Sequence, residues 1–132
     1  MIENLIDFLK KKDYAALTEE LSIDVKVYDD RLALNYNQKD SPKHHPIADL
    51  CRGLIVSLPD YKILCRSFDR FYNWHEDPLS DQFDITQAFC YKKVDGSLLN
   101  VYHYKQWEAA TRKMAFAEGV PPYGGNVSFR QL

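Results

Sequence analysis

The stretch that decides the fold is Val25–Tyr36, which reads VKVYDDRLALNY. Side chains alternate along Val25–Tyr28 and again along Leu32–Tyr36, with the two-residue period of paired β-strands. Asp29-Asp30-Arg31 lies between these runs and forms a polar turn. Strands joined by so short a turn pair as an antiparallel hairpin, so this stretch predicts an antiparallel sheet.

The residues before this hairpin follow the period of a helix instead. Ile2, Leu5, Ile6, Phe8 and Leu9 recur at helical spacing, and a second apolar set follows with Tyr14, Leu17 and Leu21. The pattern predicts two short helices within residues 2–22.

The residues after the hairpin return to strand patterns. Strands are predicted over Gly53–Leu58 and Lys62–Phe68, with Pro59-Asp60 as their turn, and over Ala88–Lys93 and Leu98–Tyr104, with Asp95-Gly96 as theirs. Trp107–Arg112 is a further predicted strand, residues 37–47 and 75–86 are predicted loops, and residues 119–126 break regular structure. The fold class is therefore α+β, with short N-terminal helices followed by an antiparallel β-sheet.

Composition narrows the class of protein. The chain has 132 residues, 45% of them hydrophobic, which suits one domain with a true core. Its net charge of −2 excludes a protein that binds nucleic acid over a generally basic surface, so any contact with nucleic acid has to be local. Three cysteines without a Cys-x-x-Cys pair indicate free thiols in a reducing compartment. No signal peptide or membrane-spanning run is present, and we expect a cytoplasmic protein with no membrane partner.

The tetrad Lys93-Val94-Asp95-Gly96 has two interpretations. Alternation places Lys93 and Asp95 on one face of a strand end, where a solvated ion pair is the simplest reading. The chemical reading is a nucleophilic lysine, whose amine has to be neutral to attack and is made so by burial or by cationic neighbours. Attack on the α-phosphorus of ATP would give a phosphoramide and expel pyrophosphate, and it would need cationic groups and a metal ion to spread the phosphate charge.

Residues upstream supply candidate partners for such a lysine. Cys51-Arg52-Gly53 places an arginine at the entrance of an apolar strand. Arg66–Trp74 interleaves arginines with aromatic residues, a mixture that suits base stacking together with a phosphate contact. The alternative is a core strand with arginines that reach past apolar surface to solvent.

Taken together, these residues resemble the phage-type ATP-dependent RNA ligases of the RNA ligase 1 family, which are covalent nucleotidyltransferases. The resemblance rests on Arg52-Gly53-Leu54-Ile55, Phe68–Asn73 and Lys93–Leu98, and it runs from about Tyr36 to Glu118. It implies the N-terminal part of an ATP-grasp-like adenylyltransferase domain. The implied division is a helical segment at 1–23, a sheet with the nucleotide site at 24–118, and a tail or truncated connection at 119–132.

The resemblance also implies roles for individual residues. Lys93 would take AMP from ATP with Mg²⁺ as cofactor, then pass it to an RNA 5′-phosphate before sealing to a 3′-hydroxyl, as in RNA repair. Asp95 and Gly96 would shape the loop around the lysine and ribose, Arg52 would lie beside the phosphate, and Tyr72 would pack on adenine. The remaining nucleotide-binding candidates are Arg70, where relatives often have lysine, Tyr36 and Arg112.

Two departures from the family pattern define the alternatives. Thr111-Arg112-Lys113-Met114 lacks the Gly-Ser that relatives have after the basic residue. The family's later glutamates and its late Lys-x-Lys pair have no room before Leu132, so we expect either a fragment of a longer ligase or a catalytically dead nucleotide- or RNA-binding relative. No residue is assigned to a metal, because His44, His45, His75 and His103 lack the spacing of a zinc site.

Overall fold

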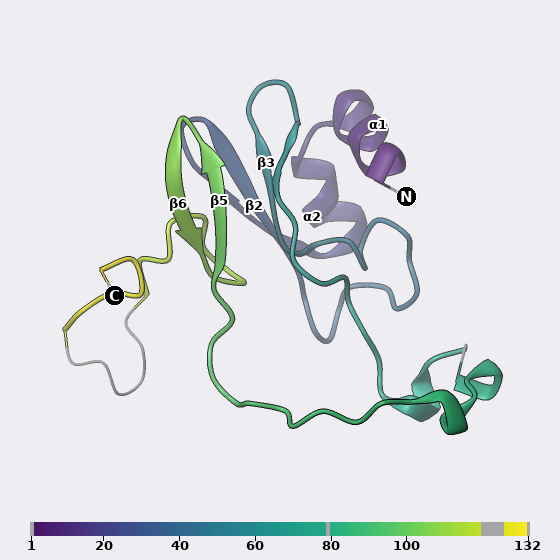
Figure 1. The fold of residues 1–132 in the computed structure, drawn as a ribbon. Coiled ribbons are helices and arrows are strands. Elements are labelled where there is room, and N and C mark those ends of the chain that lie inside the picture. The colour runs from purple at the N-terminus through teal and green to yellow at the C-terminus, as the bar shows by residue number, and fades with distance from the viewer. Residues whose placement is uncertain (1, 79, 120–125, 132) are drawn as a thin grey trace.

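The computed structural model describes residues 2–78, 80–119 and 126–131, and it confirms the α+β class (Figure 1). The two helices are α1 (Ile2–Lys12) and α2 (Ala15–Leu21). The strands are β1 (Ile23–Val27), β2 (Arg31–Tyr36), β3 (Arg52–Ser57), β4 (Ile63–Cys65), β5 (Asn100–Tyr104) and β6 (Gln106–Ala110). Three 3₁₀ helices, η1 (Trp74–Glu76), η2 (Ser80–Gln82) and η3 (Ile85–Gln87), lie in the long connection between β4 and β5.

The Val25–Tyr36 hairpin is the centre of the fold. Strands β1 to β4 form an antiparallel sheet in chain order, with Val25 opposite Leu34 in the first pair and Leu34 opposite Leu54 in the second. Strands β5 and β6 form a separate antiparallel pair. Each connection within the sheet is local, so the pattern of apolar residues was sufficient to predict it.

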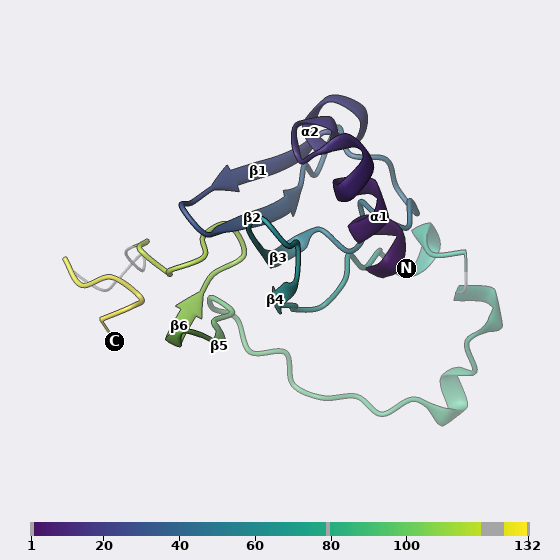
Figure 2. The ribbon, with the colours of Figure 1, turned by 90° about the horizontal axis from the view of Figure 1, so that it is seen from above.

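Strand β2 is buried along its whole length because both faces of the sheet are covered. Leu32, Leu34 and Tyr36 belong to the core cluster that includes Leu5 and Leu9 of α1, on the helical face. Ala33, between them, belongs to a second cluster with Tyr102 of β5. Figure 2 shows the helices and the β5–β6 pair on opposite sides of the sheet. The strand period of two therefore assigns alternate residues to two different cores.

The structure contradicts the predicted strand over Ala88–Lys93. Residues 88–99, here called the arm, form no strand, and strand structure resumes only at Asn100. The arm runs outside the sheet (Figure 2), and none of its described residues pairs with a strand. A strand needs a neighbour to bond its N–H and C=O groups, so apolar alternation alone did not create one here.

Three further predicted segments differ from the structure or lie partly outside the described residues. The strand predicted over Lys62–Phe68 ends at Cys65, and the predicted loop at 75–86 contains the three short 3₁₀ helices. Residues 120–125 of the predicted break in regular structure lie outside the described part. No helix within that part is both long and apolar enough to cross a membrane.

Candidate functional site

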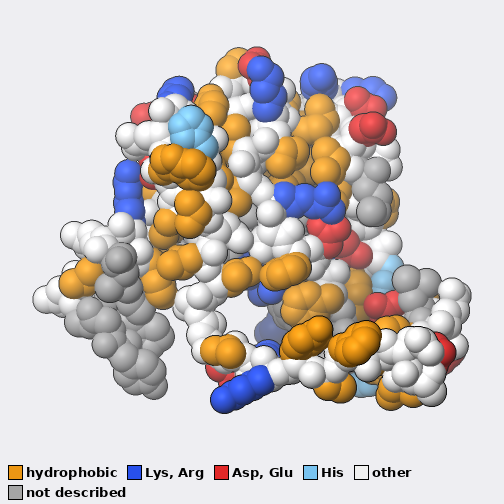
Figure 3. Space-filling view, in the orientation of Figure 1, with side chains coloured by type: hydrophobic (Ala, Val, Ile, Leu, Met, Phe, Trp, Pro, Cys, Tyr) orange, Lys and Arg blue, Asp and Glu red, His pale blue; other side chains and the backbone are white. Residues whose placement is uncertain are grey.

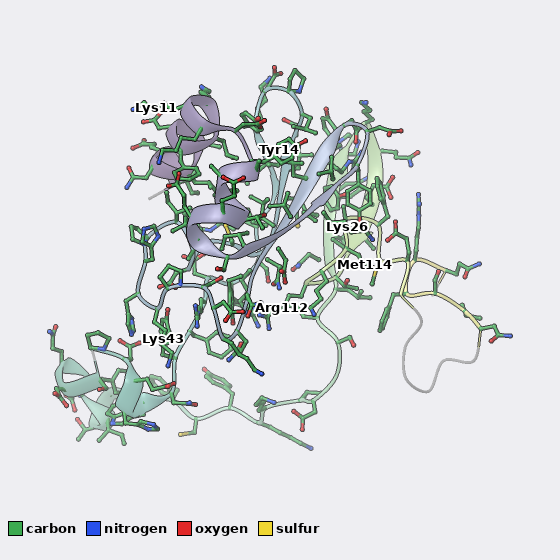
Figure 4. All side chains as sticks on the ribbon, turned by 180° about the vertical axis from the view of Figure 1, so that it is seen from behind. Lys11, Tyr14, Lys26, Lys43, Arg112 and Met114 are labelled. Carbon is green, nitrogen blue, oxygen red and sulfur yellow. The ribbon has the colours of Figure 1, made fainter. Side chains whose placement is uncertain are left out.

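Four separate parts of the chain meet at one pocket of about 410 Å³, here called the arginine–aromatic pocket. Tyr36 comes from the end of β2, Arg52 from the start of β3, and Arg112 from the turn after β6. The segment after β4 contributes Arg70–Asn73. Figure 4 shows Arg112 between Lys43, on the loop side, and Met114. Five of the eight residues predicted for the site line this pocket: Tyr36, Arg52, Arg70, Tyr72 and Arg112.

Guanidinium groups stack on the aromatic rings of this pocket. Arg70 lies 4.4 Å and Arg112 4.6 Å from the ring centroid of Tyr36. Arg70 is also 5.3 Å from the ring of Tyr72, and Arg52 is 4.9 Å from the ring of Phe71. These contacts hold the positive charges of three arginines close together against aromatic rings.

Gly53 is the local reason that Arg52 and Arg112 lie together. Its φ of +69° is in the region that favours glycine, and a Cβ there would lie 3.0 Å from Cα of Arg112. The side chain of Arg112 is held in turn by Asn35, whose Oδ1 accepts a 2.9 Å hydrogen bond from Nε. The Arg-Gly pair seen in the sequence thus permits a close backbone approach.

Hydrogen bonds to the hydroxyl of Tyr72 hold this side chain against the protein, so its ring is only partly exposed to solvent. Its hydroxyl donates a 2.5 Å hydrogen bond to Oδ1 of Asp49 and accepts one from the backbone N–H of His44, while its ring packs 4.0 Å from the His44 ring. Burial, with the bond to Asp49, raises the pKa of Tyr72. Its neighbour Phe71 is 69% exposed and lines the same pocket. Phe71 is therefore the freer ring for stacking on a flat ligand.

The pocket carries positive charge that no carboxylate of the described residues pairs with. In the described part of the chain, none of Arg52, Arg70 and Arg112 forms an ion pair with a carboxylate. Arg70 is only 8% exposed, and its guanidinium donates a 3.2 Å hydrogen bond to the backbone carbonyl of Ser41. A buried charge without a counter-ion is costly, so this arrangement suits an anionic ligand.

Glu76 does not supply the missing negative charge to the arginines. It lies on the rim and pairs with Lys43 at 2.8 Å. The Lys43 ammonium and the backbone N–H of Asn73 hold the pKa of Glu76 at about 2. Glu76 and Lys43 therefore neutralise each other at physiological pH, and the three arginines keep their charge.

A second pocket of about 480 Å³ adjoins the first, because Arg52 and Arg112 line both. It contains no carboxylate among its described lining residues and adds the cation Lys113. Gly96 is a predicted site residue that lines this pocket and not the arginine–aromatic pocket. The lining comprises Arg52, Ser67, Gly96, Ser97, Leu98, Asn100, Thr111, Arg112, Lys113, Met114, Gly119 and Phe129.

Lys93 and Asp95 are not in either pocket. Both lie on the arm, with side chains 85% and 88% exposed, and they form an ion pair with each other. The structure thus gives this pair the solvated arrangement that the tetrad alone suggested, although Gly96 lies at the second pocket. Figure 3 shows the molecule hollowed between the arm and the sheet, with hydrophobic side chains along the arm.

The expected Mg²⁺ cofactor stays a prediction, because magnesium is commonly held by substrate phosphates with one or two carboxylates, and the described residues form no metal site of their own. They contain no group of three or more His, Cys, Asp or Glu side chains able to hold a metal. Glu76, the carboxylate of the arginine–aromatic pocket, is already paired with Lys43. No step of the chemistry below is therefore routed through a metal.

Sequence reasoning missed Phe71, Lys43 and Lys113 as pocket residues. Phe71 carries a signal, since it lies in the arginine-rich aromatic segment, although the family resemblance points to Tyr72 as the ring that packs on adenine. Lys113 lies next to Arg112 in the tetrad Thr111-Arg112-Lys113-Met114. Lys43 carried no signal, because a lysine in a polar loop is ordinary.

Comparison with known proteins identifies a viral relative. The chain is 35% identical over 128 residues to a protein of Autographa californica nuclear polyhedrosis virus named "Putative bifunctional polynucleotide kinase/RNA ligase". The match covers 88% of this chain but only 18% of that protein. No protein-family model matches the chain, and no solved structure matches it significantly. The similarity supports a relationship to an RNA ligase.

Proposed function

We propose that this chain is a nucleotide-binding part of an ATP-dependent RNA ligase, with ATP and RNA ends as its substrates. The observation that carries the proposal is the arginine–aromatic pocket. Three arginines, with no carboxylate partner among the described residues, lie against aromatic rings there, and one ring, Phe71, is open to solvent. An adenine ring would stack on the aromatic side while the phosphates meet the guanidinium groups.

The relative adds the class of reaction. It is named as a kinase and RNA ligase, and this chain matches 18% of its length, so ligation by this chain is part of the proposal. In the first step Nζ of Lys93 attacks the α-phosphorus, a P–N bond forms, and the P–O bond to pyrophosphate breaks as the nitrogen loses a proton. In the second step an oxygen of an RNA 5′-phosphate attacks the same phosphorus, and the P–N electron pair returns to Nζ. Attack by an RNA 3′-hydroxyl then seals the strand and releases AMP.

The protein's own residues have three tasks in this scheme. Arg52, Arg70 and Arg112 offset phosphate charge in a pocket that is partly closed to water. Gly53 keeps Arg52 close to Arg112. The arm has to bring Lys93 to the phosphate, which breaks its ion pair with Asp95 and leaves the amine free to lose its proton.

The test is intact-mass spectrometry after incubation with ATP and magnesium. The proposal predicts a covalent gain of one AMP that Lys93→Ala abolishes. Lys92→Ala is the matched control, because Lys92 is an exposed lysine next to it on the same arm, and it should keep the adduct. An adduct that survives in Lys93→Ala, or disappears in Lys92→Ala, would contradict the assigned nucleophile.

The exposure of Lys93 favours a second candidate, which is nucleotide binding without chemistry. Equilibrium binding of ATP separates the two. If the chain binds ATP, loses affinity in Arg70→Met and forms no adduct, it is a binding relative. If it neither binds ATP nor forms an adduct, both candidates fail.

A further inference from the structure

We propose that a cavity at the opposite end of β2 from the arginine–aromatic pocket binds a guanine base. This cavity of about 520 Å³ is here called the glutamate cavity. It is formed by the β1–β2 turn with its flanking residues (Val27–Arg31), by Gln106 and Glu108 of β6, and by Phe116 and Arg130.

The glutamate cavity is separate from the candidate site. Arg31 begins β2 and lines this cavity, whereas Tyr36 ends β2 and lines the arginine–aromatic pocket, so about 17 Å of strand lies between them. No described residue of the glutamate cavity lines either pocket of the site. The inference therefore goes beyond the proposed function and needs neither ATP nor Lys93.

Glu108 is a buried carboxylate whose hydrogen bonds are incomplete. It is 5% exposed, and its Oε1 accepts a 2.6 Å hydrogen bond from Nε2 of Gln106. Its Oε2 is buried with no hydrogen-bond partner among the described residues, although Nη2 of Arg130 lies 3.1 Å away as an ion-pair contact. A buried carboxylate oxygen without a donor costs free energy. The cavity therefore suits a ligand that donates N–H groups to Glu108.

The charges around the cavity favour a neutral ligand. Arg130 lies beside Glu108, and Nε of Arg31 pairs with Oδ1 of Asp30 at 2.6 Å. Each of these charges thus has an opposite charge next to it, and Asp29, the remaining charged lining residue, is exposed to water. Neither a phosphate nor an ammonium group is needed for balance. The ligand is then a neutral group that both donates and accepts hydrogen bonds.

Guanine is the base whose polar edge matches Glu108 and Arg130. Its N1–H and N2–H₂ donors are neighbours and suit one carboxylate, while O6 and N7 accept from an arginine. Among the described residues, the Arg130 guanidinium donates one 3.4 Å hydrogen bond, to Oε1 of Glu108, so its other N–H groups are available to O6. Adenine and cytosine offer a carboxylate one amino group, and uracil offers one N–H between two carbonyl oxygens.

The apolar part of the lining suits a flat ligand. Tyr28 and Phe116 both line the cavity, with ring centroids 5.1 Å apart and the rings edge to face. Aromatic walls with a few convergent polar groups are typical of sites for small planar ligands, and a base can pack on them. Arg130 is placed at this wall by its backbone N–H, which donates a 3.1 Å hydrogen bond to the carbonyl of Ala117.

The experiment compares bases in an otherwise identical RNA strand. An eight-nucleotide oligouridine with a 5′-hydroxyl and a 3′ fluorophore is titrated with protein in the absence of ATP, with guanosine or adenosine at its fourth position. We expect the guanosine strand to bind about tenfold more tightly, the discrimination typical of a two-point base contact. Inosine, which lacks the N2 amino group, should reduce that ratio to about threefold.

Glu108→Gln should lower the guanosine-to-adenosine ratio to about twofold or less, because an amide NH₂ replaces one acceptor oxygen. Arg130→Met is the second variant, since the Arg130 side chain is 48% exposed and its loss leaves the core intact; it should lower the ratio to about threefold. Glu118→Gln is the matched control and should leave the ratio unchanged. Glu118 is an exposed glutamate that pairs with Lys26 outside the cavity.

Equal binding of the guanosine and adenosine strands would overturn the inference, as would inosine that binds like guanosine. If the ratio survives in Arg130→Met and in any folded Glu108→Gln protein, the guanine site lies elsewhere and the inference fails.

The guanine can come from an RNA strand or from a free nucleotide, and competition with GMP separates these sources. GMP that displaces the guanosine strand at about the Kd of the strand assigns the cavity to a free guanine nucleotide. Displacement that needs at least about tenfold more GMP assigns it to RNA. Both outcomes support a guanine site.

The proposed function can fail separately. A guanosine preference that depends on Glu108 supports the glutamate cavity even if no AMP adduct forms on Lys93. An AMP adduct without any guanosine preference supports the proposed first step and rejects the guanine site.

Discussion

Two buried arginines differ in whether a carboxylate compensates their positive charge. Arg31 is 4% exposed and lies in a complete set of partners, with Nε 2.6 Å from Oδ1 of Asp30 and Nη1 2.8 Å from the Tyr102 hydroxyl. Arg70 is almost as buried and has no carboxylate partner in the described residues. The first arrangement stabilises the fold, and the second leaves a charge for a ligand to meet.

Asp30→Asn tests the structural arginine. The Arg31 guanidinium, followed by the Lys105 ammonium, holds the pKa of Asp30 at about 2. Because the folded pKa lies below the unfolded value, the stabilisation is complete above about pH 4 and is lost as pH falls toward 2. We expect Asp30→Asn to lower the free energy of unfolding by about 2 kcal/mol at pH 7 and by about half of that at pH 3. Urea unfolding of both proteins at the two pH values measures this, and a deficit that grows at pH 3 would contradict it.

Gly53→Ala tests the backbone approach that places Arg52 beside Arg112. The new Cβ would meet backbone atoms of Arg112 at 3.0 and 3.1 Å, at a φ of +69°. We expect a loss of about 2 kcal/mol or more in the free energy of unfolding, together with weaker ATP binding. Gly96→Ala is the control for the contact with Arg112: its φ of +152° also strains an alanine, but a Cβ there meets nothing within 4 Å, so it should lose less free energy of unfolding than Gly53→Ala. An unchanged free energy of unfolding in Gly53→Ala would rule out this role for the glycine.

At the scale of elements, local pattern was enough for the helices and for the four-stranded sheet. Each of these elements pairs or packs with its neighbour in the chain, so spacing within a short window contained the information. The arm shows where this fails. Its alternation is that of a strand, but a strand also requires a partner, and no short window of sequence contains one.

The residues predicted for the site also fall into two groups, those that the fold places in the pocket and those that lie outside it. Tyr36, Arg52 and Arg112 lie on strands or in the turn after β6. Arg70 and Tyr72 lie in the irregular segment after β4, where hydrogen bonds to Ser41 and Asp49 hold them at the same pocket. Lys93 and Asp95 lie on the arm and stay outside it. The choice between Phe71 and Tyr72 as the open ring depended on Asp49 and His44, which are distant in sequence from both.

The cysteines test the contrast between the arm and the sheet. Cys90 lies on the arm and is exposed, whereas Cys51 and Cys65 are buried, and burial raises the pKa of Cys51 to about 12. A thiol reacts with maleimide as the thiolate, so we expect one label per native chain at about pH 7.5. Intact mass should show three labels in urea and none on native Cys90→Ser. Rapid labelling of Cys51 in the native protein would mean that the sheet opens far more easily than its packing indicates.

At the scale of the whole molecule, the net charge of the chain and the local charge of its two pockets have opposite signs. The chain is acidic by two charges, yet its two adjoining pockets gather cations that have no carboxylate partner among the described residues, namely Arg52, Arg70, Arg112 and Lys113. A chain of this kind should repel the body of an RNA strand and attract only its end. Binding should then depend on the terminal phosphate and hardly at all on the length of the strand, unlike a basic protein that follows the backbone.

The salt dependence of RNA binding tests that view. If contacts are confined to Arg52, Arg112 and Lys113, each release of a counter-ion from single-stranded RNA contributes about −0.7 to the slope, and log Kobs against log salt should have a slope of about −2. An RNA of about 24 nucleotides should give the same slope as one of eight when both carry a 5′-phosphate, and Lys113→Ala should make both shallower by about 0.7. A slope that steepens with length would show that cations outside the two pockets follow the strand, and binding would then be a property of the surface rather than of the RNA end.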